Sequence, residues 1–141
     1  MPPPDKPMHR NRPLVRTTPM TVKLRKPPIP KQVKVAVLRR AGGLCDMCGK
    51  PVRDTRWDPH HRKLRSQGGQ DDTANLLCTH RTCHDRIHAN PAWAYRAGLL
   101  VRSHDDPATR PVWHRDTRWR LAGEREWVGC EAPTDDREDV A

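Results

Sequence analysis

The chain has 141 residues, of which 34% are hydrophobic and 4% aromatic, so it has room for one small domain with a thin apolar core. It contains no run of 18 apolar residues and no apolar segment near its N-terminus, which excludes a membrane span and argues against a secretory signal. Its net charge is +10. Small domains with little apolar surface often depend on a metal or on disulfides, and five Cys and eight His favour a metal.

The positive charge is concentrated at the N-terminal end. Residues 1–40 contain eleven Lys or Arg and one Asp, whereas residues 41–141 carry equal numbers of the two signs. Residues 1–30 also hold nine of the fifteen Pro, so we expect an extended basic arm there. Such an arm suits contacts with DNA phosphates, which release condensed counterions, through Lys23, Arg25 and Lys26. A solubilising tail is the alternative.

The first ordered element is expected at residues 31–41, between Pro30 and Gly42. Apolar side chains at 33, 37 and 38 fall on one face of a helix, while alternation at 33, 35 and 37 would also fit a strand. We therefore expect a helix and keep the strand as the alternative.

The later elements are expected to be short. In chain order they are a knuckle at 44–51, a strand at 52–61, a loop at 62–74, a strand at 75–78, a helix at 83–90, a second helix from Pro91, and a strand at 99–101. Within an extension at 102–130, Trp113, Trp119 and Trp127 are expected to cover the core rather than to stack on bases. Residues 131–141 are an acidic tail.

Two cysteine pairs have spacings that suit a zinc ion. Cys45 and Cys48 are separated by two residues, and Cys78 and Cys83 by four. Two such knuckles can direct four sulfurs at one tetrahedral ion, so we expect a structural four-cysteine zinc site. Four buried or free thiols are the alternative. Cys130 has no neighbouring partner and is expected to be an ordinary thiol.

Histidines form the second cluster of candidate residues. His84 and His88 are four apart, so a helix presents both on one face, where they can bind one divalent ion. Cys83 projects about 100° away around the same helix, which can therefore contribute to both metal sites.

His60 and His61 are adjacent, and neighbours on a strand face opposite sides. One of them can then be a ligand and the other a base. Phosphodiester hydrolysis needs both, because a divalent ion neutralises charge on the phosphate while a neutral His takes the proton of the attacking water. Asn75 can hold that His by accepting from its Nδ1–H, which leaves Nε2 as the base.

Together these residues resemble a known family. The pattern His60-His61-Arg62, Gly68-Gly69, Asn75-Leu76-Leu77-Cys78, Cys83-His84 and Ile87-His88 is similar to HNH endonucleases of the ββα-metal group, in their zinc-knuckle form from tailed phages and bacteria. The resemblance covers about residues 42–101, although Cys78 and Cys83 lie further apart than the usual two-residue spacing. It implies a small α+β fold, in which a β-hairpin and a helix hold one ion beside the knuckle and residues 31–101 form the nuclease domain.

The resemblance also implies a role for each residue. His61 is the general base, His60, His84 and His88 bind the catalytic ion, and Asn75 is the middle residue of the motif. The implied cofactors are a structural Zn²⁺ and a catalytic Mg²⁺, Mn²⁺, Ni²⁺ or Zn²⁺. The implied partner is DNA, with a phage packaging terminase as a further one, in the cytoplasm of a bacterial or phage-infected cell.

Several alternatives stay open. The histidines can instead form a second structural zinc site, the chain can be a non-catalytic zinc-dependent DNA-binding module, or it can be a toxin-like nuclease acting on RNA or host DNA. Arg62 and Arg65 can grip the scissile phosphate or lie on a solvated loop. The remaining histidines, which are His9, His80, His104 and His114, are expected to be surface residues.

Overall fold

The computed structural model describes residues 25–53 and 56–134, so His9, Lys23, most of the predicted arm and the end of the acidic tail lie outside the described residues. The fold is small α+β, as expected. Its elements are α1 (Lys31–Ala41), β1 (Asp58–His61), the 3₁₀ helix η1 (Arg65–Gln67), β2 (Leu76–Thr79), α2 (Arg81–Ala89), α3 (Pro91–Arg96), β3 (Val112–His114), β4 (Arg118–Ala122) and β5 (Trp127–Gly129). Among the described residues, no helix has the length and apolar character needed to cross a membrane.

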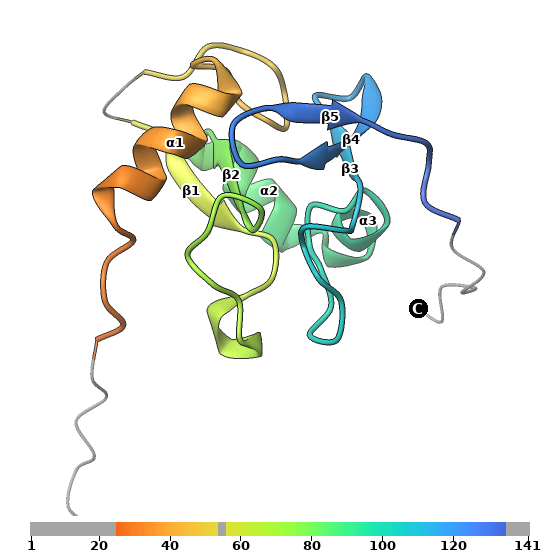
Figure 1. The fold of residues 1–141 in the computed structure, drawn as a ribbon, viewed down its shortest axis with the longest axis horizontal. Helices are drawn as coiled ribbons and strands as arrows, with labels where there is room; N and C mark the ends of the chain where they lie inside the picture. The colour runs from red at the N-terminus through yellow and green to blue at the C-terminus, as the bar shows by residue number, and fades with distance from the viewer. Residues whose placement is uncertain (1–24, 54–55, 135–141) are drawn as a thin grey trace, which may run out of the picture.

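An antiparallel β1–β2 hairpin lies at the centre, with α1 against one face and α2 against the other (Figure 1). Side chains of β2 alternate between these faces, as strand geometry requires. Leu76 and Cys78 join the cluster that contains Val37 of α1, whereas Leu77 joins the cluster that contains Ile87 of α2. The few hydrophobic side chains of the protein thus form two small cores, one on each side of the hairpin.

Residues 31–41 form a helix, so the strand alternative is wrong. The helix ends because Gly42 adopts a left-handed conformation, with φ of 63°, which glycine tolerates without a steric cost. Val37, fully buried, faces β2, while Val35 on the opposite side is 43% exposed. The buried positions therefore follow the 3.6-residue period of a helix and not the two-residue period of a strand.

The expected strand at 99–101 is absent, although the apolar run is buried. The amides of Leu99 and Leu100 both donate to the carbonyl of Ala94 in α3, at 2.8 and 3.1 Å. Backbone groups used to close a helix end are not available for a strand ladder, so the run packs as a helix terminus. It joins the same core as Leu77 and Ile87.

The loop at 62–75 is held in shape by its own polar groups. The side-chain oxygen of Asn75 accepts from the amide of Lys63 at 2.6 Å, and its nitrogen donates to the carbonyls of Lys63 and Gln70 at 3.0 and 2.9 Å. Gly69 is required because a Cβ there would lie 1.8 Å from the carbonyl oxygen of Lys63. The loop after β1 is consequently well fixed despite having little regular structure.

Arg62 does not lie on a solvated loop, and it is not placed to grip a phosphate, because it is fully buried. Its guanidinium donates to backbone carbonyls between α3 and β3, with the shortest distances to Gly98, Pro107 and Arg110 at 2.9, 2.8 and 2.6 Å. Burial lowers the pKa of Arg62 to about 9. The side chain therefore connects the end of β1 to the 98–111 segment.

We expect Arg62→Met to lower the free energy of unfolding by about 3 kcal/mol or more, because a fully buried side chain would stop donating to the carbonyls of Gly98, Pro107 and Arg110 at once. The change corresponds to a fall of roughly 10 °C in Tm, measured by circular dichroism. Arg96→Met is the matched control, since Arg96 is exposed, and it should change stability by no more than about 0.5 kcal/mol. Equal melting temperatures for the two variants would contradict this role of Arg62.

The extension forms a second sheet with the order β3-β4-β5 (Figure 1), and the turn after β3 contacts the knuckle, where the amide of Arg115 donates to the carbonyl of Asp46. His114 was expected at the surface but is fully buried, and its Nε2 lies 2.9 Å from Oδ1 of Asp46, which is also fully buried. Trp113 and Trp127 pack against the core that contains Leu77 and Ile87, as predicted, whereas Trp119 contacts the ring of Trp113, with centroids 5.4 Å apart. The extension is thereby joined to the knuckle through a buried polar pair.

Candidate metal clusters and active site

The first cluster of metal-binding side chains lies where the knuckle meets the start of α2. Cys45, Cys48, His80 and Cys83 each offer one ligand atom, and these atoms all lie within 4.8 Å of one another. Three sulfurs and one imidazole nitrogen form a common donor set for a tetrahedral structural zinc ion. Burial and the neighbouring thiols of Cys45 and Cys48 raise the pKa of the Cys83 thiol. A divalent cation would relieve this repulsion between thiolates, so the residues fit zinc.

The set differs from the expected one in a single member, because the structure brings in His80 and not Cys78. Cys78 is fully buried in the core under α1. Its sulfur is not grouped with the ligand atoms of Cys45, Cys48, His80 and Cys83, and burial together with the negative charge of Asp46 raises its pKa to about 12. The backbone of Cys78 holds the knuckle instead, since its amide donates to Oδ2 of Asp46 at 2.8 Å.

His80 is oriented as a metal-binding histidine would be. Its Nε2 lies 2.9 Å from the carbonyl oxygen of Pro51, while its Nδ1 lies 3.3 Å from Sγ of Cys48. A ligating histidine commonly donates its other ring N–H to a carbonyl, which fixes the ring. The sequence did contain a signal for this residue: His80 and Cys83 are separated by two residues, the same spacing as Cys45 and Cys48.

The second cluster consists of His60, His84 and His88, whose ligand atoms also lie within 4.8 Å of one another. His60 comes from β1, and the other two come from one face of α2, as their four-residue spacing predicted. The ring centroids of His84 and His88 are 4.7 Å apart, and that of His60 is 5.2 and 5.4 Å from them. Helix α2 therefore contributes to both clusters.

The polar atoms of this triad fit a divalent ion. Nε2 of His60 lies 2.7 Å from the carbonyl oxygen of Leu99, whereas Nδ1 of His60 is buried and has no hydrogen-bond partner among the described residues. Burial lowers the pKa of His60 to about 3, so the ring is neutral, as a ligand must be. Exposure increases from buried His60 through His84 to exposed His88. One side of the triad thus faces solvent, which is the pattern of an open, catalytic site.

His61 stands outside the triad, in keeping with strand alternation, and its partner is not the expected one. Nε2 of His61 lies 2.7 Å from Oδ1 of Asp71. Asn75 does not hold His61, because the hydrogen bonds of its side chain go to Lys63 and Gln70 in the loop that follows β1. Sequence reasoning missed Asp71, for which the only signal was its position among turn residues.

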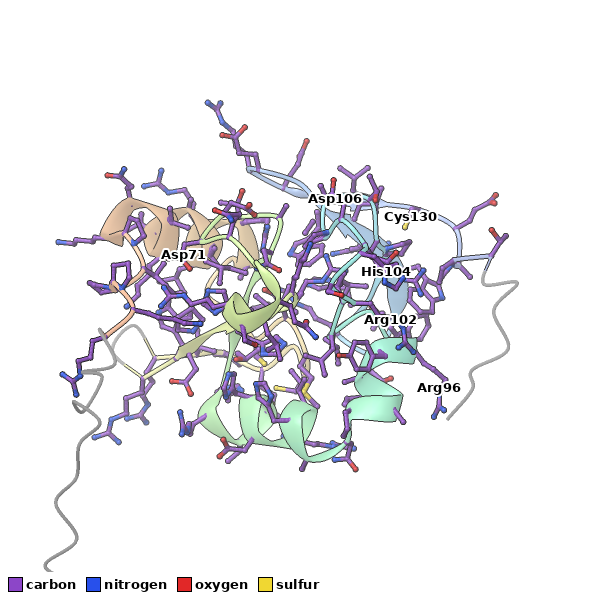
Figure 2. The ribbon with its side chains drawn as sticks, turned by 90° about the horizontal axis from the view of Figure 1, so that it is seen from below. Asp71, Arg96, Arg102, His104, Asp106 and Cys130 are labelled. Atoms are coloured by element: carbon purple, nitrogen blue, oxygen red, sulfur yellow. The ribbon has the colours of Figure 1, made fainter. Side chains whose placement is uncertain are left out.

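Four further charged residues lie near the site or in the described part of the arm. Asp58 pairs with Arg81 at 3.0 Å and does not join the triad. Arg65 pairs with Asp71 at 2.7 Å. Arg25 and Lys26 are exposed, so both are available to a polyanion. Figure 2 labels Asp71 on the loop after β1, and His104 and Arg102 on the segment between α3 and β3.

Comparison with known proteins bears on the segment that carries both clusters. Residues 45–90 match the model of the HNH endonuclease family. The match includes every member of the two clusters, together with His61 and Asp71, and it confirms the family resemblance over that part of the chain. It covers less than half of the sequence. No curated protein and no solved structure matches the chain significantly.

Proposed function

We propose that this chain is a metal-dependent endonuclease that hydrolyses phosphodiester bonds in DNA. The observation that carries the proposal is the convergence of His60, His84 and His88, with His61 next to His60 in the chain but outside the cluster, within an HNH family match. A purely structural zinc site is favoured less, because the triad leaves one side open to solvent. The Cys45, Cys48, His80 and Cys83 group would hold the structural zinc.

In this proposal His61 is the general base. It takes a proton from water as the water oxygen forms a bond to phosphorus, and the bond from phosphorus to the leaving oxygen breaks. A divalent ion bound by the triad supplies positive charge that stabilises the phosphate and the leaving oxygen. The buried hydrogen bond from His60 to Leu99 keeps that ring in position to bind the ion.

The substrate is proposed to be DNA on the strength of the family match and the basic N-terminal region. Residues 1–40 carry the whole excess of positive charge, and two of their described cations, Arg25 and Lys26, are exposed. Arg65 is a weaker phosphate contact than expected, because Asp71 already neutralises it. The comparisons name no phage protein and no terminase, so we propose neither as a partner.

The test of the function is cleavage of supercoiled plasmid by the zinc-loaded chain, with and without EDTA and after addition of Mg²⁺, Mn²⁺ or Ni²⁺. We expect nicked or linear products that disappear with EDTA and return with excess divalent ion. DNA binding without cleavage under all metals would favour the non-catalytic module. Preferential cleavage of RNA in a mixture with equal DNA would favour the toxin-like nuclease.

Deleting residues 1–26 should weaken DNA binding far more than it slows turnover at saturating substrate. The cut preserves Ile29, which packs near α1, and Pro30, whose carbonyl accepts the first helical bonds. It removes seven cations against Asp5, and the salt slope of log K should fall by about 0.9 for each DNA phosphate that these cations neutralise in the full chain. The value of kcat should change little, because interactions that are equal in ground and transition states do not alter it.

Affinity across a salt series and kcat would be measured for the full and shortened chains. A full-length control, in which the same seven cations are replaced by Gln, separates charge from length. An unchanged salt slope in both variants would assign the arm a role other than phosphate binding. A collapse of kcat with unchanged affinity would instead mean that the arm helps to build the active site.

A further inference from the structure

Asp71 is contacted by two side chains at once, and one of them belongs to the proposed base, His61. Its Oδ1 lies 2.7 Å from Nε2 of His61 and 3.0 Å from Nε of Arg65, and its Oδ2 lies 2.7 Å from Nη2 of Arg65. The side chains of His61, Asp71 and Arg65 are 16%, 23% and 24% exposed. The group is therefore largely shielded from water, which strengthens each of its hydrogen bonds.

The charge of Asp71 determines the direction of the contact with His61. Although burial opposes ionisation, the hydrogen bonds from Arg65 and His61 outweigh it and hold the pKa of Asp71 below its ordinary value. An ionised carboxylate can only accept hydrogen bonds. Nε2 of His61 must therefore be the donor, and Nδ1 of a neutral His61 is left as the nitrogen that can accept a proton.

The position of Asp71 is itself fixed by the loop. Asn75 holds the carbonyls of Lys63 and Gln70, and Gly69 allows the backbone at residue 63 to approach closely. The guanidinium of Arg65 donates to both oxygens of the Asp71 carboxylate, and this bidentate contact restricts rotation of the carboxylate. Asn75 therefore affects His61 only indirectly, because it stabilises the loop that positions Asp71.

We propose that Asp71 is the positioning residue of His61, fixing its ring orientation and its tautomer so that Nδ1 receives the proton of the attacking water. The carboxylate also stabilises the positive charge that the ring acquires when it takes that proton. Arg65 serves this contact by holding Asp71 rather than by gripping the substrate. The inference rests on the proposed function of the same site.

The kinetic test compares Asp71→Ala, Asp71→Asn and Arg65→Met in plasmid cleavage, with zinc content and Tm measured to establish that each variant is folded. For Asp71→Ala we expect kcat to fall by roughly 10- to 100-fold with KM unchanged, the usual cost of removing a group that orients a functional histidine. Asp71→Asn keeps an acceptor for His61 and should lose less. Arg65→Met keeps the carboxylate and should also lose less.

Two kinetic outcomes would overturn the inference while leaving the function in place. The first is an undiminished kcat in folded Asp71→Ala. The second is an equal loss in Asp71→Ala and Arg65→Met, which would mean that the ion pair merely stabilises the loop. Absence of cleavage by the wild-type chain would instead refute the proposed function, and with it any catalytic effect of Asp71.

A spectroscopic test does not depend on activity. In the zinc-loaded chain labelled with ¹⁵N at histidine, the ring nitrogens of His61 should report a single tautomer protonated at Nε2, and Asp71→Ala should replace it with a mixture. His61→Ala identifies the signal. A His61 spectrum that Asp71→Ala leaves unchanged would refute the orienting contact.

Discussion

His61→Ala is expected to abolish plasmid cleavage while leaving folding and zinc content intact. The variant removes the proposed base, and general-base catalysis typically contributes roughly 10²- to 10⁴-fold to rate. It leaves both metal clusters complete, because His61 belongs to neither. Cleavage would be measured as initial rates of plasmid nicking at saturating Mg²⁺, alongside zinc content and the thermal melt.

The matched control is His104→Ala, which removes the same ring from a side chain that is 60% exposed and belongs to neither metal cluster. It should cleave at the wild-type rate. If His61→Ala retained more than about a tenth of the wild-type activity, His61 would not be the base. If it also lost zinc, the histidine would have a structural role instead.

Local spacing predicted the triad well, because helical geometry depends only on neighbours in the chain. His84 and His88 had to share a face once residues 81–89 formed a helix, and alternation on β1 had to separate His60 from His61. The structure adds the convergence of strand and helix, which follows from pairing of β1 with β2 and packing of α2 against them.

The partners of these groups could not be predicted in the same way. Asp71 reaches His61 because the loop at 62–75 folds back, and that path depends on Gly69 and on the carbonyls that Asn75 holds. Arg62 appeared to be a surface cation, yet backbone carbonyls far along the chain surround it. Contacts of this kind arise from tertiary packing, and no periodicity in the sequence indicates them.

The knuckle cluster differs in one residue from the set that the spacing of the cysteines predicted. Four cysteines appeared to be the complete set, but Cys78 lies on β2, where alternation directs it into the core with Leu76. His80 follows the end of that strand and directly precedes α2, two residues apart from Cys83. Secondary-structure context therefore decides between two residues that both have the chemistry for zinc.

Replacement of Cys48 or His80 should release zinc and unfold the chain, even though both side chains are at least partly exposed. Structural zinc contributes roughly 10–16 kcal/mol of apparent binding free energy in zinc-finger peptides, which matches or exceeds the roughly 5–15 kcal/mol that stabilises a typical domain. For Cys48→Ser and His80→Ala we therefore expect loss of bound zinc, loss of a cooperative melt and aggregation. Zinc would be measured by mass spectrometry of the purified, dialysed protein.

Cys78→Ala is the decisive comparison. If burial alone determined the effect, Cys78→Ala would destabilise the protein more than Cys48→Ser, whereas zinc ligation predicts the reverse. Cys78 is fully buried and Cys48 is exposed, so without zinc the buried residue would matter more, and an exposed substitution would cost no more than about 0.5 kcal/mol. With zinc held by Cys45, Cys48, His80 and Cys83, Cys78→Ala should keep a full equivalent of zinc and lose only packing, whereas Cys48→Ser should lose the metal and the fold. Zinc lost from Cys78→Ala but kept in His80→Ala would restore the four-cysteine site. Stable, zinc-free protein in all three variants would mean that the cluster binds no structural metal.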